Sequence, residues 1–193
     1  VGNKLYVANS GGYRVPNYDR TVSVIDLDSF TVIKTIDVAI NLHRMAVDAR
    51  GMIYVSSRGD YYDIHSNVFV IDSKIDKVVN QLDVPASEFC LSGDSLYYYS
   101  TEYSKNEGKN HVSFGIIDTR TQQVLSDQII KDGTDSYIMM PYGLAVNPET
   151  KEIFITDAQD YVVTGLVYCY SPEGILKWRT LAGNIPAHFT FLE

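Results

Sequence analysis

Basic residues are scarce in this sequence. Its 193 residues include 16 Lys and Arg against 24 Asp and Glu, a formal net charge of −8. A nucleic-acid groove needs clustered Lys and Arg to neutralise phosphates, so this balance argues against a nucleic-acid partner. The chain also lacks any apolar run of 18 residues or more, so we expect no segment of it to span a membrane.

Cysteine and histidine are scarce as well. Cys90 and Cys169 fall on predicted strands of different repeats, and we expect them to be buried free thiols. The histidines are spread along the chain without zinc-motif spacing: His43, His65, His111 and His188. No Gly-x-Ser-x-Gly elbow, P-loop or dinucleotide fingerprint occurs, so we expect a non-enzymatic protein without metal or cofactor.

What the sequence does contain is a repeat. Ile25-Asp26 returns as Ile71-Asp72 and as Ile117-Asp118, at a fixed interval of 46 residues. Four further segments alternate apolar with small or polar residues: LYVANS (5–10), IYVSSRG (53–59), LYYYSTE (96–102) and IFITDAQ (153–159). Strand-like repeats with a period of 40 to 50 residues predict an all-β fold, a β-propeller of four-stranded blades.

The repeats divide the chain, residues 1–193, into about four blades of one domain or domain fragment. Each blade has strands A to D, and the blades cover approximately 1–36 plus 186–192, 44–82, 88–128 and 143–181. The first repeat lacks an A strand, whereas 188–192 is similar to an A strand with no blade after it. Two interpretations stay open: a four-bladed ring closed by this last strand, or the C-terminal part of a larger ring. The start at Val1, without Met and in mid-turn, favours the second.

The long connections are expected to project from one face of the propeller. The B–C loops, 11–20, 58–67, 102–110 and 158–165, and the D–A loop 131–141 are long and rich in tyrosine, whereas the opposite turns are short and lack comparable aromatics. Tyrosine offers a rigid apolar ring with a hydroxyl group, which suits a binding surface. The predicted ligand-binding residues are Tyr13, Arg14, Tyr18, Arg58, Tyr61, Tyr62, Tyr103, Tyr137 and Tyr161. The alternative is that these tyrosines pack on one another and stiffen the loops.

The carboxylates allow several roles. Asp26, Asp72 and Asp118 end C strands, where a carboxylate commonly caps the following turn through backbone N–H groups. Loop carboxylates could instead hold a calcium ion, or could form the positioned pair that a glycosidase needs. The candidates for these two roles are Asp60, Asp63, Asp157 and Asp160.

The repeats resemble a known family. LYVANS, IYVSSRG and IFITDAQ, with the Val-x-Val-Ile-Asp strand and the Thr-x-x-Val strand that follow, resemble the YVTN-repeat (YncE-like) propellers, which usually have seven blades. A narrower likeness is to surface-layer-like surface lipoproteins of gut Bacteroidetes. It rests on three segments: 41–44 (NLHR), 57–63 (SRGDYYD) and 185–192 (IPAHFTFL).

This resemblance carries functional expectations. Some members of the lipoprotein group capture cobalamin at the cell surface and pass it to an outer-membrane transporter. The resemblance therefore implies a corrinoid or other small ligand across the loop-rich face, and a transporter or surface protein as partner. It also implies a lipid-anchored location at the cell surface or outer membrane, or a periplasmic one, and three further blades upstream. A surface-layer-like protein-interaction scaffold is the alternative, followed by a glycan-active enzyme.

Overall fold

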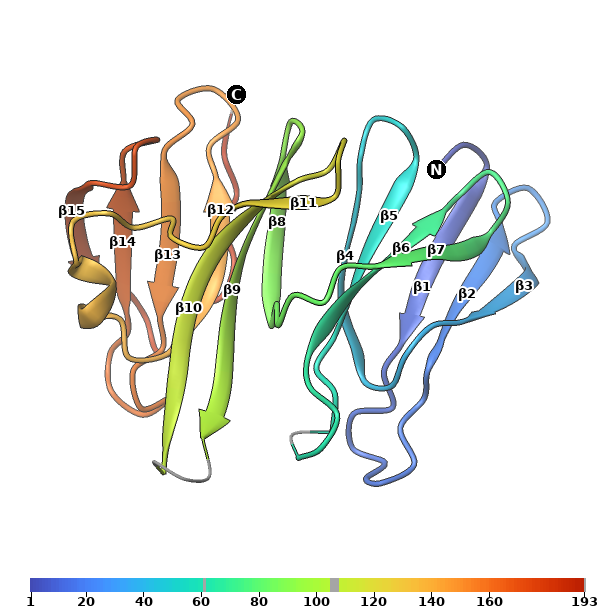
Figure 1. Ribbon diagram of the computed structural model, residues 1–193, viewed down its shortest axis with the longest axis horizontal. Coiled ribbons are helices and arrows are strands. Elements are labelled where there is room, and N and C mark those ends of the chain that lie inside the picture. Colours follow the sequence, from blue (N-terminus) through green and yellow to red (C-terminus); the bar gives the residue numbers. More distant parts are fainter. Residues whose placement is uncertain (61, 105–107, 193) are drawn as a thin grey trace. The chain divides into compact units, whose positions relative to one another are not determined.

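The computed structural model describes residues 1–60, 62–104 and 108–192, which form four antiparallel sheets (Figure 1). The chain divides into two compact units, residues 1–87 (unit 1) and 88–193 (unit 2), each with two sheets. Among the described residues the one helix is a 3-10 turn, η1 (Thr134–Tyr137). No helix in this part of the chain has the length and hydrophobicity that crossing a membrane requires.

Unit 1 contains a three-stranded and a four-stranded sheet, each a meander of sequential strands. The first sheet has the order β1-β2-β3, and the second β4-β5-β6-β7. Their bounds are β1 (Lys4–Asn9), β2 (Thr21–Asp26), β3 (Thr31–Asp37), β4 (Leu42–Val47), β5 (Met52–Ser57), β6 (Asn67–Asp72) and β7 (Lys77–Gln81). The predicted absence of an A strand from the first repeat agrees with the three strands of the first sheet.

Unit 2 contains two four-stranded meanders. The third sheet has the order β11-β10-β9-β8, and the fourth β12-β13-β14-β15. Their bounds are β8 (Glu88–Ser92), β9 (Ser95–Ser104), β10 (Lys109–Asp118), β11 (Gln123–Ser126), β12 (Pro141–Val146), β13 (Ile153–Asp157), β14 (Leu166–Tyr170) and β15 (Leu176–Leu181).

Each unit has its own apolar core because alternate residues of a strand point to the same side of the sheet. In unit 1 the core is aliphatic, with Val24 and Ile71 fully buried. In unit 2 it is more aromatic: the rings of Tyr168 and Tyr170 are fully buried and lie 6.3 Å apart in a stacked arrangement. Burial raises the pKa of the Tyr170 hydroxyl to about 12, so this residue stays neutral in the core.

A polar contact joins the two sheets of unit 1. The Lys4 ammonium lies 2.7 Å from the Asp76 carboxylate in the β6–β7 turn, and the Tyr6 hydroxyl donates to the same carboxylate. Burial opposes ionisation of Asp76, but these two donors outweigh it and lower its pKa. The first sheet is therefore tied to the second by charge as well as by apolar packing.

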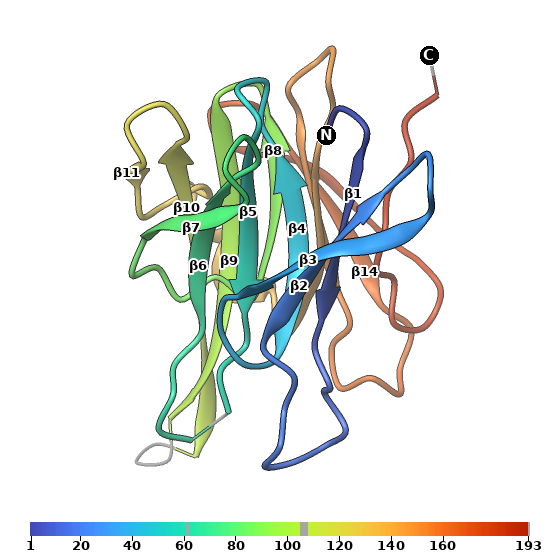
Figure 2. The same cartoon turned by 90° about the vertical axis from the view of Figure 1, so that its right-hand side faces the viewer.

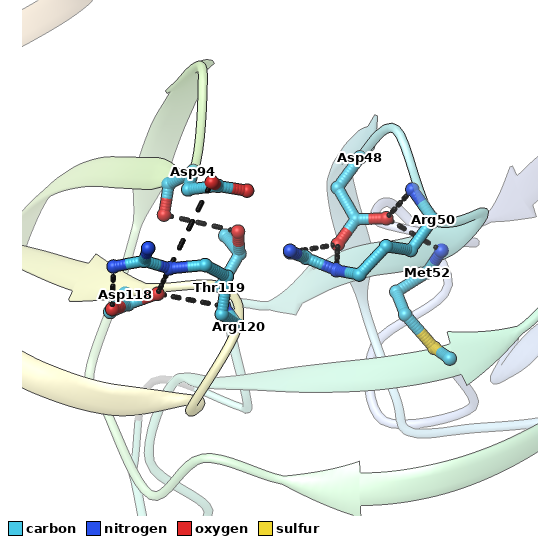
Figure 3. A network of polar contacts seen from close by, with 7 residues as sticks. All are labelled: Asp48, Arg50, Met52, Asp94, Asp118, Thr119 and Arg120. Carbon is cyan, nitrogen blue, oxygen red and sulfur yellow. Dashed lines mark hydrogen bonds and ion pairs between the residues drawn. The ribbon is translucent and has the colours of Figure 1, made fainter.

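The predicted capping of the short turns is confirmed. Asp26, Asp72 and Asp118 each accept a backbone N–H from the turn that follows, with N to O distances of 2.8 Å. In unit 2, Arg120 also places Nη2 2.8 Å from Asp118 Oδ2, as Figure 3 shows. These hydrogen bonds and the charge of Arg120 lower the pKa of Asp118 to about 2.

The β4–β5 turn of unit 1 uses a similar device. Asp48 Oδ1 accepts from the backbone N–H groups of Arg50 and Met52, and its Oδ2 lies 2.6 Å from Arg50 Nη2 (Figure 3). Only 1% of the Asp48 side chain is exposed. The short turns are therefore fixed by carboxylates, which explains their tight form.

Two expectations about secondary structure were wrong. The predicted loop 102–110 is largely strand, because β9 and β10 remain paired out to Ser104 and Lys109. The expected strand at 188–192 has irregular backbone instead. There the rings of Phe189 and Phe191 pack 5.6 and 5.5 Å from that of Phe154, so aromatic contact with the fourth sheet holds this segment without strand pairing.

Candidate functional site

In three sheets the second predicted strand of the blade ends at the same structural point. β1, β5 and β13 are each followed, two residues later, by a residue with positive φ: Gly11 (56°), Gly59 (63°) and Gln159 (52°). This left-handed conformation turns the chain away from the sheet and begins the loop. In the third sheet Glu102 occupies the equivalent place, and β9 continues through it. Since Gln159 also adopts the left-handed conformation, the lack of glycine at this position does not by itself predict the longer hairpin.

The long loops of unit 1 lie together at one end of its two sheets. Figure 1 shows that the connections after β1 and β5 both leave the lower end of unit 1, and Figure 2 shows the same from the side. In unit 2 the β9–β10 hairpin and the β13–β14 connection likewise share an end. Within each unit, the predicted common end for these loops is observed.

Asn41 links the two loops of unit 1. Its backbone N–H donates to the Asp19 carbonyl at 3.1 Å, and its own carbonyl accepts from the Arg58 N–H at 3.1 Å. Its side-chain Nδ2 donates to the Gly59 carbonyl at 3.1 Å, and the residue is 4% exposed. Asn41 adopts a left-handed φ of 52°, which asparagine tolerates better than most residues. The loop composition of the sequence does not predict this residue as part of the site.

The β1–β2 loop presents Tyr13 and Arg14. Gly11 packs so closely on Asp19 that an added Cβ would lie 2.5 Å from its backbone nitrogen. Arg14 Nη1 lies 2.8 Å from Asp19 Oδ1, and Arg14 N–H donates to the Gly11 carbonyl. Tyr13 is fully exposed on this folded loop, whereas Tyr18 is half-buried. The prediction of an exposed ring thus fits Tyr13 and fits Tyr18 only in part.

The β5–β6 loop is organised by Asp60. Its Oδ1 accepts from the N–H groups of Tyr62, Asp63 and Ile64, each at 2.9 Å. These backbone hydrogen bonds lower the pKa of Asp60. Tyr62 is 66% exposed on the loop so formed. The predicted site residue Tyr61 lies outside the described residues.

Arg58 stands at the start of this loop and contacts His43. Arg58 Nη2 lies 2.8 Å from His43 Nε2, and both side chains are exposed. The structure therefore brings Arg58 and Tyr62 onto one loop, joined through Asn41 to the loop of Tyr13 and Arg14. This unit 1 surface, the Asn41-linked surface, consists of Tyr13, Arg14, His43, Arg58 and Tyr62.

In unit 2 Asp157 plays the linking part. Its carboxylate accepts from the N–H groups of Met139 (3.1 Å), Met140 (2.8 Å) and Gln159 (2.8 Å), and the residue is 1% exposed. The loop before β12 is thereby tied to the loop after β13. Its neighbour Asp160 accepts from the N–H groups of Val162 and Val163, both at 2.9 Å. Both carboxylates are thus engaged by backbone donors.

Tyr161 and Tyr142 form the aromatic part of this end of unit 2. Their ring centroids lie 5.7 Å apart, nearly perpendicular at 82°, an edge-to-face contact. Both rings are partly exposed, and Met139 and Val162, in the two loops that Asp157 joins, are exposed by 61% and 74%. Tyr161 is one of the predicted residues, whereas Tyr142 is not, because it lies on strand β12 and not in a loop.

Tyr137 lies at the end of η1. It is 58% exposed, and the Arg179 guanidinium lies over its ring, 5.5 Å from the centroid. The backbone of Tyr103 is in β9, opposite Asn110, and not in a loop as expected; its side chain is outside the described part of the structure. The described members of the predicted set are therefore divided between the two units.

The described residues offer no cluster of three His, Cys, Asp or Glu side chains that could hold a metal ion. Three of the candidate calcium or catalytic carboxylates, Asp60, Asp157 and Asp160, accept hydrogen bonds from backbone N–H groups. Cys169 is buried and Cys90 half-buried, both as free thiols, and burial raises the pKa of Cys169. The expectation that the short turns lack comparable aromatics is wrong for the β2–β3 turn, where Phe30 is 73% exposed.

Comparison with known proteins supports the fold. No family model matches the chain, and no curated protein matches it either. Among solved structures it is similar to Kuenenia stuttgartiensis hydrazine synthase (TM-score 0.68, 16% identity, 94% of this chain and 47% of that one).

Two further structures are similar at lower scores. One is the Dos1 propeller (TM-score 0.54, 12% identity, 86% of this chain and 44% of that one). The other is a Bacteroides caccae protein of unknown function (TM-score 0.55, 13% identity, 98% of this chain and 62% of that one). The chain spans about half the length of these proteins. At such low identities the likeness establishes the fold alone: the four sheets of this all-β chain are blades of the β-propeller type.

Proposed function

We propose that this protein is a non-enzymatic binding propeller whose tyrosine-bearing loops take up a small, partly apolar ligand. The observation that carries the proposal is the Asn41-linked surface. There Tyr13 and Tyr62 are exposed on loops that Asn41, Asp19 and Asp60 hold in place. Aromatic rings held at fixed positions lose little entropy when a ligand covers them, so such a surface favours binding.

A corrinoid is the first candidate for the ligand. The support is the resemblance to the cobalamin-capturing surface lipoproteins, together with a surface that offers flat rings beside the two guanidinium groups of Arg14 and Arg58. In this proposal the protein acts at the cell surface or outer membrane, or in the periplasm, and passes its ligand to an outer-membrane transporter. It belongs to a ring with further blades upstream.

The direct test is titration of the chain with cobalamin, followed by absorbance and by calorimetry. We expect binding at micromolar concentrations that Tyr13→Ala and Tyr62→Ala each weaken. Phe30→Ala is the matched control, because Phe30 is also an exposed aromatic of unit 1 but lies in the β2–β3 turn. Absence of binding at micromolar concentrations would exclude a corrinoid as the ligand. Equal losses of affinity in all three variants would exclude the Asn41-linked surface as the binding site.

A protein-interaction scaffold is the second candidate function, and a different observation favours it. On the first sheet, Leu5, Val7 and Val32 are exposed by 40%, 37% and 59%, so apolar side chains of β1 and β3 face solvent. A surface of this kind suits contact with another polypeptide. Recovery from the membrane of one stoichiometric protein partner, with no small ligand bound, would favour the scaffold over the ligand-binding protein.

A further inference from the structure

Among residues 1–60, 62–104 and 108–192, strand β10 has no strand neighbour along much of its outer edge. It pairs with β9 along its whole length, from Lys109 to Asp118, but with β11 only at Ile116, Ile117 and Asp118. The register shifts between Ile116 and Ile117, and the pairing with β11 ends one residue beyond this shift. Within the part of the chain that the structure describes, residues 109–115 therefore have a strand partner on one side only, and such an edge is a template for an added strand.

A cavity of about 310 Å³ lies along this edge. One wall is formed by Val112, Ser113 and Phe114 of β10, and the other by residues 127–130 with Asp135 of η1. This volume is at the lower end of the range for ligand sites, on the order of 300 to 1,000 Å³, which suits a short stretch of peptide.

The far wall of the cavity is fixed to the fourth sheet. Lys131 N–H donates to the Gly174 carbonyl at 2.9 Å, and Leu176 N–H donates to Asp132 Oδ2 at 2.7 Å. Gly174 has a left-handed φ of 86°, and an added Cβ would lie 2.0 Å from the Ile129 carbonyl oxygen. These contacts hold the wall against the β14–β15 turn.

The cavity is acidic. Asp127 and Asp135 both line it, and within residues 1–60, 62–104 and 108–192 neither carboxylate forms an ion pair or a side-chain hydrogen bond. The chain as a whole carries a net charge of −8. The bare edge supplies backbone hydrogen-bonding groups, and the two carboxylates supply a preference for cationic side chains.

We propose that the outer edge of β10 is a binding site for an extended peptide segment of another protein. The segment adds as a further strand beside Val112–Gly115 and directs a Lys or Arg side chain toward Asp127 and Asp135. This site is separate from the loops of the proposed function and does not depend on them.

The test uses the full chain and a synthetic probe, an amide-capped heptapeptide of alternating threonine and lysine. We expect the probe to shift the backbone amide signals of Val112, Ser113 and Phe114 in NMR spectra. A heptapeptide with glutamate in place of lysine should not bind. Two further probes carry N-methyl groups either on every lysine or on every threonine, and only one of these should lose binding, because one edge of an added strand faces β10.

Protein variants test the acidic part of the site. The double variant Asp127→Asn with Asp135→Asn should lower the affinity for the lysine probe by roughly threefold to thirtyfold, as expected for the loss of two exposed ion pairs. The control, Asp63→Asn with Glu149→Gln, removes the same amount of charge from exposed positions elsewhere and should change the affinity little. Added salt should also weaken binding of the lysine probe.

Several outcomes would overturn the proposal. Equal binding of the lysine and glutamate probes would show that Asp127 and Asp135 do not select cationic side chains. Equal binding of both N-methylated probes would remove strand addition. Self-association of the chain, with shifts of these same β10 amides in the absence of probe, would make a second copy the occupant. No shift of these amides at millimolar probe would remove the site.

Discussion

The side-chain amide of Asn41 donates to the carbonyl oxygen of Gly59 across 3.1 Å, in a place where Asn41 is almost completely buried. The same residue bonds through its backbone to Asp19 and Arg58. Asn41, in the connection between β3 and β4, therefore sets the relative position of two other loops. The arrangement of Tyr13 and Tyr62 depends on it.

Replacing Asn41 by Gly should destabilise the protein by about 1–2 kcal/mol, because the Gly59 carbonyl loses its buried donor while the left-handed φ remains allowed. Asn41→Ala should lower the free energy of unfolding by about 1 kcal/mol more, since the left-handed φ is also unfavourable for alanine. Urea unfolding measures both, and hydrogen exchange at the Arg58 amide reports the loop. An unchanged unfolding midpoint in Asn41→Gly would show that the amide does not hold the loops.

Asp157→Ala should cost about 3 kcal/mol of unfolding free energy, because it leaves three partly buried N–H groups, those of Met139, Met140 and Gln159, without their acceptor. Asp160→Ala is the control in the same loop, where the two N–H donors are exposed and can turn to water; about 1 kcal/mol is expected there. Thermal or urea unfolding distinguishes the two variants. Equal losses would contradict the linking role of Asp157.

The acid stability of unit 2 should depend on Asp118. Its pKa in the folded protein is about 2, so its contribution is complete above the unfolded value of about 4 and is lost as pH falls from there to about 2. Arg120→Gln removes the guanidinium that lowers this pKa. The variant should therefore show a smaller decline in urea midpoint over that pH range.

A carboxyl-carbon NMR titration gives the direct reading of this effect, with the Asp118 pKa moving upward in Arg120→Gln. Arg20→Gln, which breaks an exposed ion pair with Asp37 in unit 1, is the control and should leave the Asp118 titration unchanged. If Asp118 titrates alike with and without Arg120, the guanidinium is not the cause.

Ile71→Ala should destabilise the protein by about 2–5 kcal/mol, because Ile71 is fully buried in the core of unit 1 and its loss leaves a cavity. Val32→Ala is the contrast, since Val32 is 59% exposed, and should stay within about 0.5 kcal/mol of the parent. Denaturant titration of both variants checks the pair. A small effect at Ile71 would mean that the core repacks around the gap.

Most of the fold could be predicted because it depends on local pattern. Alternation of apolar residues located the strands, and the repeated Ile-Asp pair predicted the turn caps that Asp26, Asp72 and Asp118 form. The errors came where tertiary contact decides. The 188–192 segment alternates like a strand, but its phenylalanine rings pack on Phe154, and its backbone is irregular in the described structure.

The exposed residues of the candidate site could be predicted from the sequence, but the residues that hold its loops in place could not. Tyrosines in predicted loops can be read directly from the sequence, so Tyr13, Tyr62 and Tyr161 could be predicted. The residues that hold those loops, Asn41 and Asp157, act through backbone groups far away in sequence, and no sequence pattern reports such bonds. Asp157 was therefore taken for a possible metal ligand, although its oxygens accept backbone N–H groups.

The loops of three sheets begin at a left-handed residue two positions beyond the strand, at Gly11, Gly59 and Gln159. The loop segment after that residue joins the sheet at one fixed point of the backbone, and the strand before it keeps its pairing. Evolution can therefore lengthen, shorten or exchange the segment from Tyr13 to Arg20 without disturbing the core. A scaffold of this design can acquire new specificities one loop at a time.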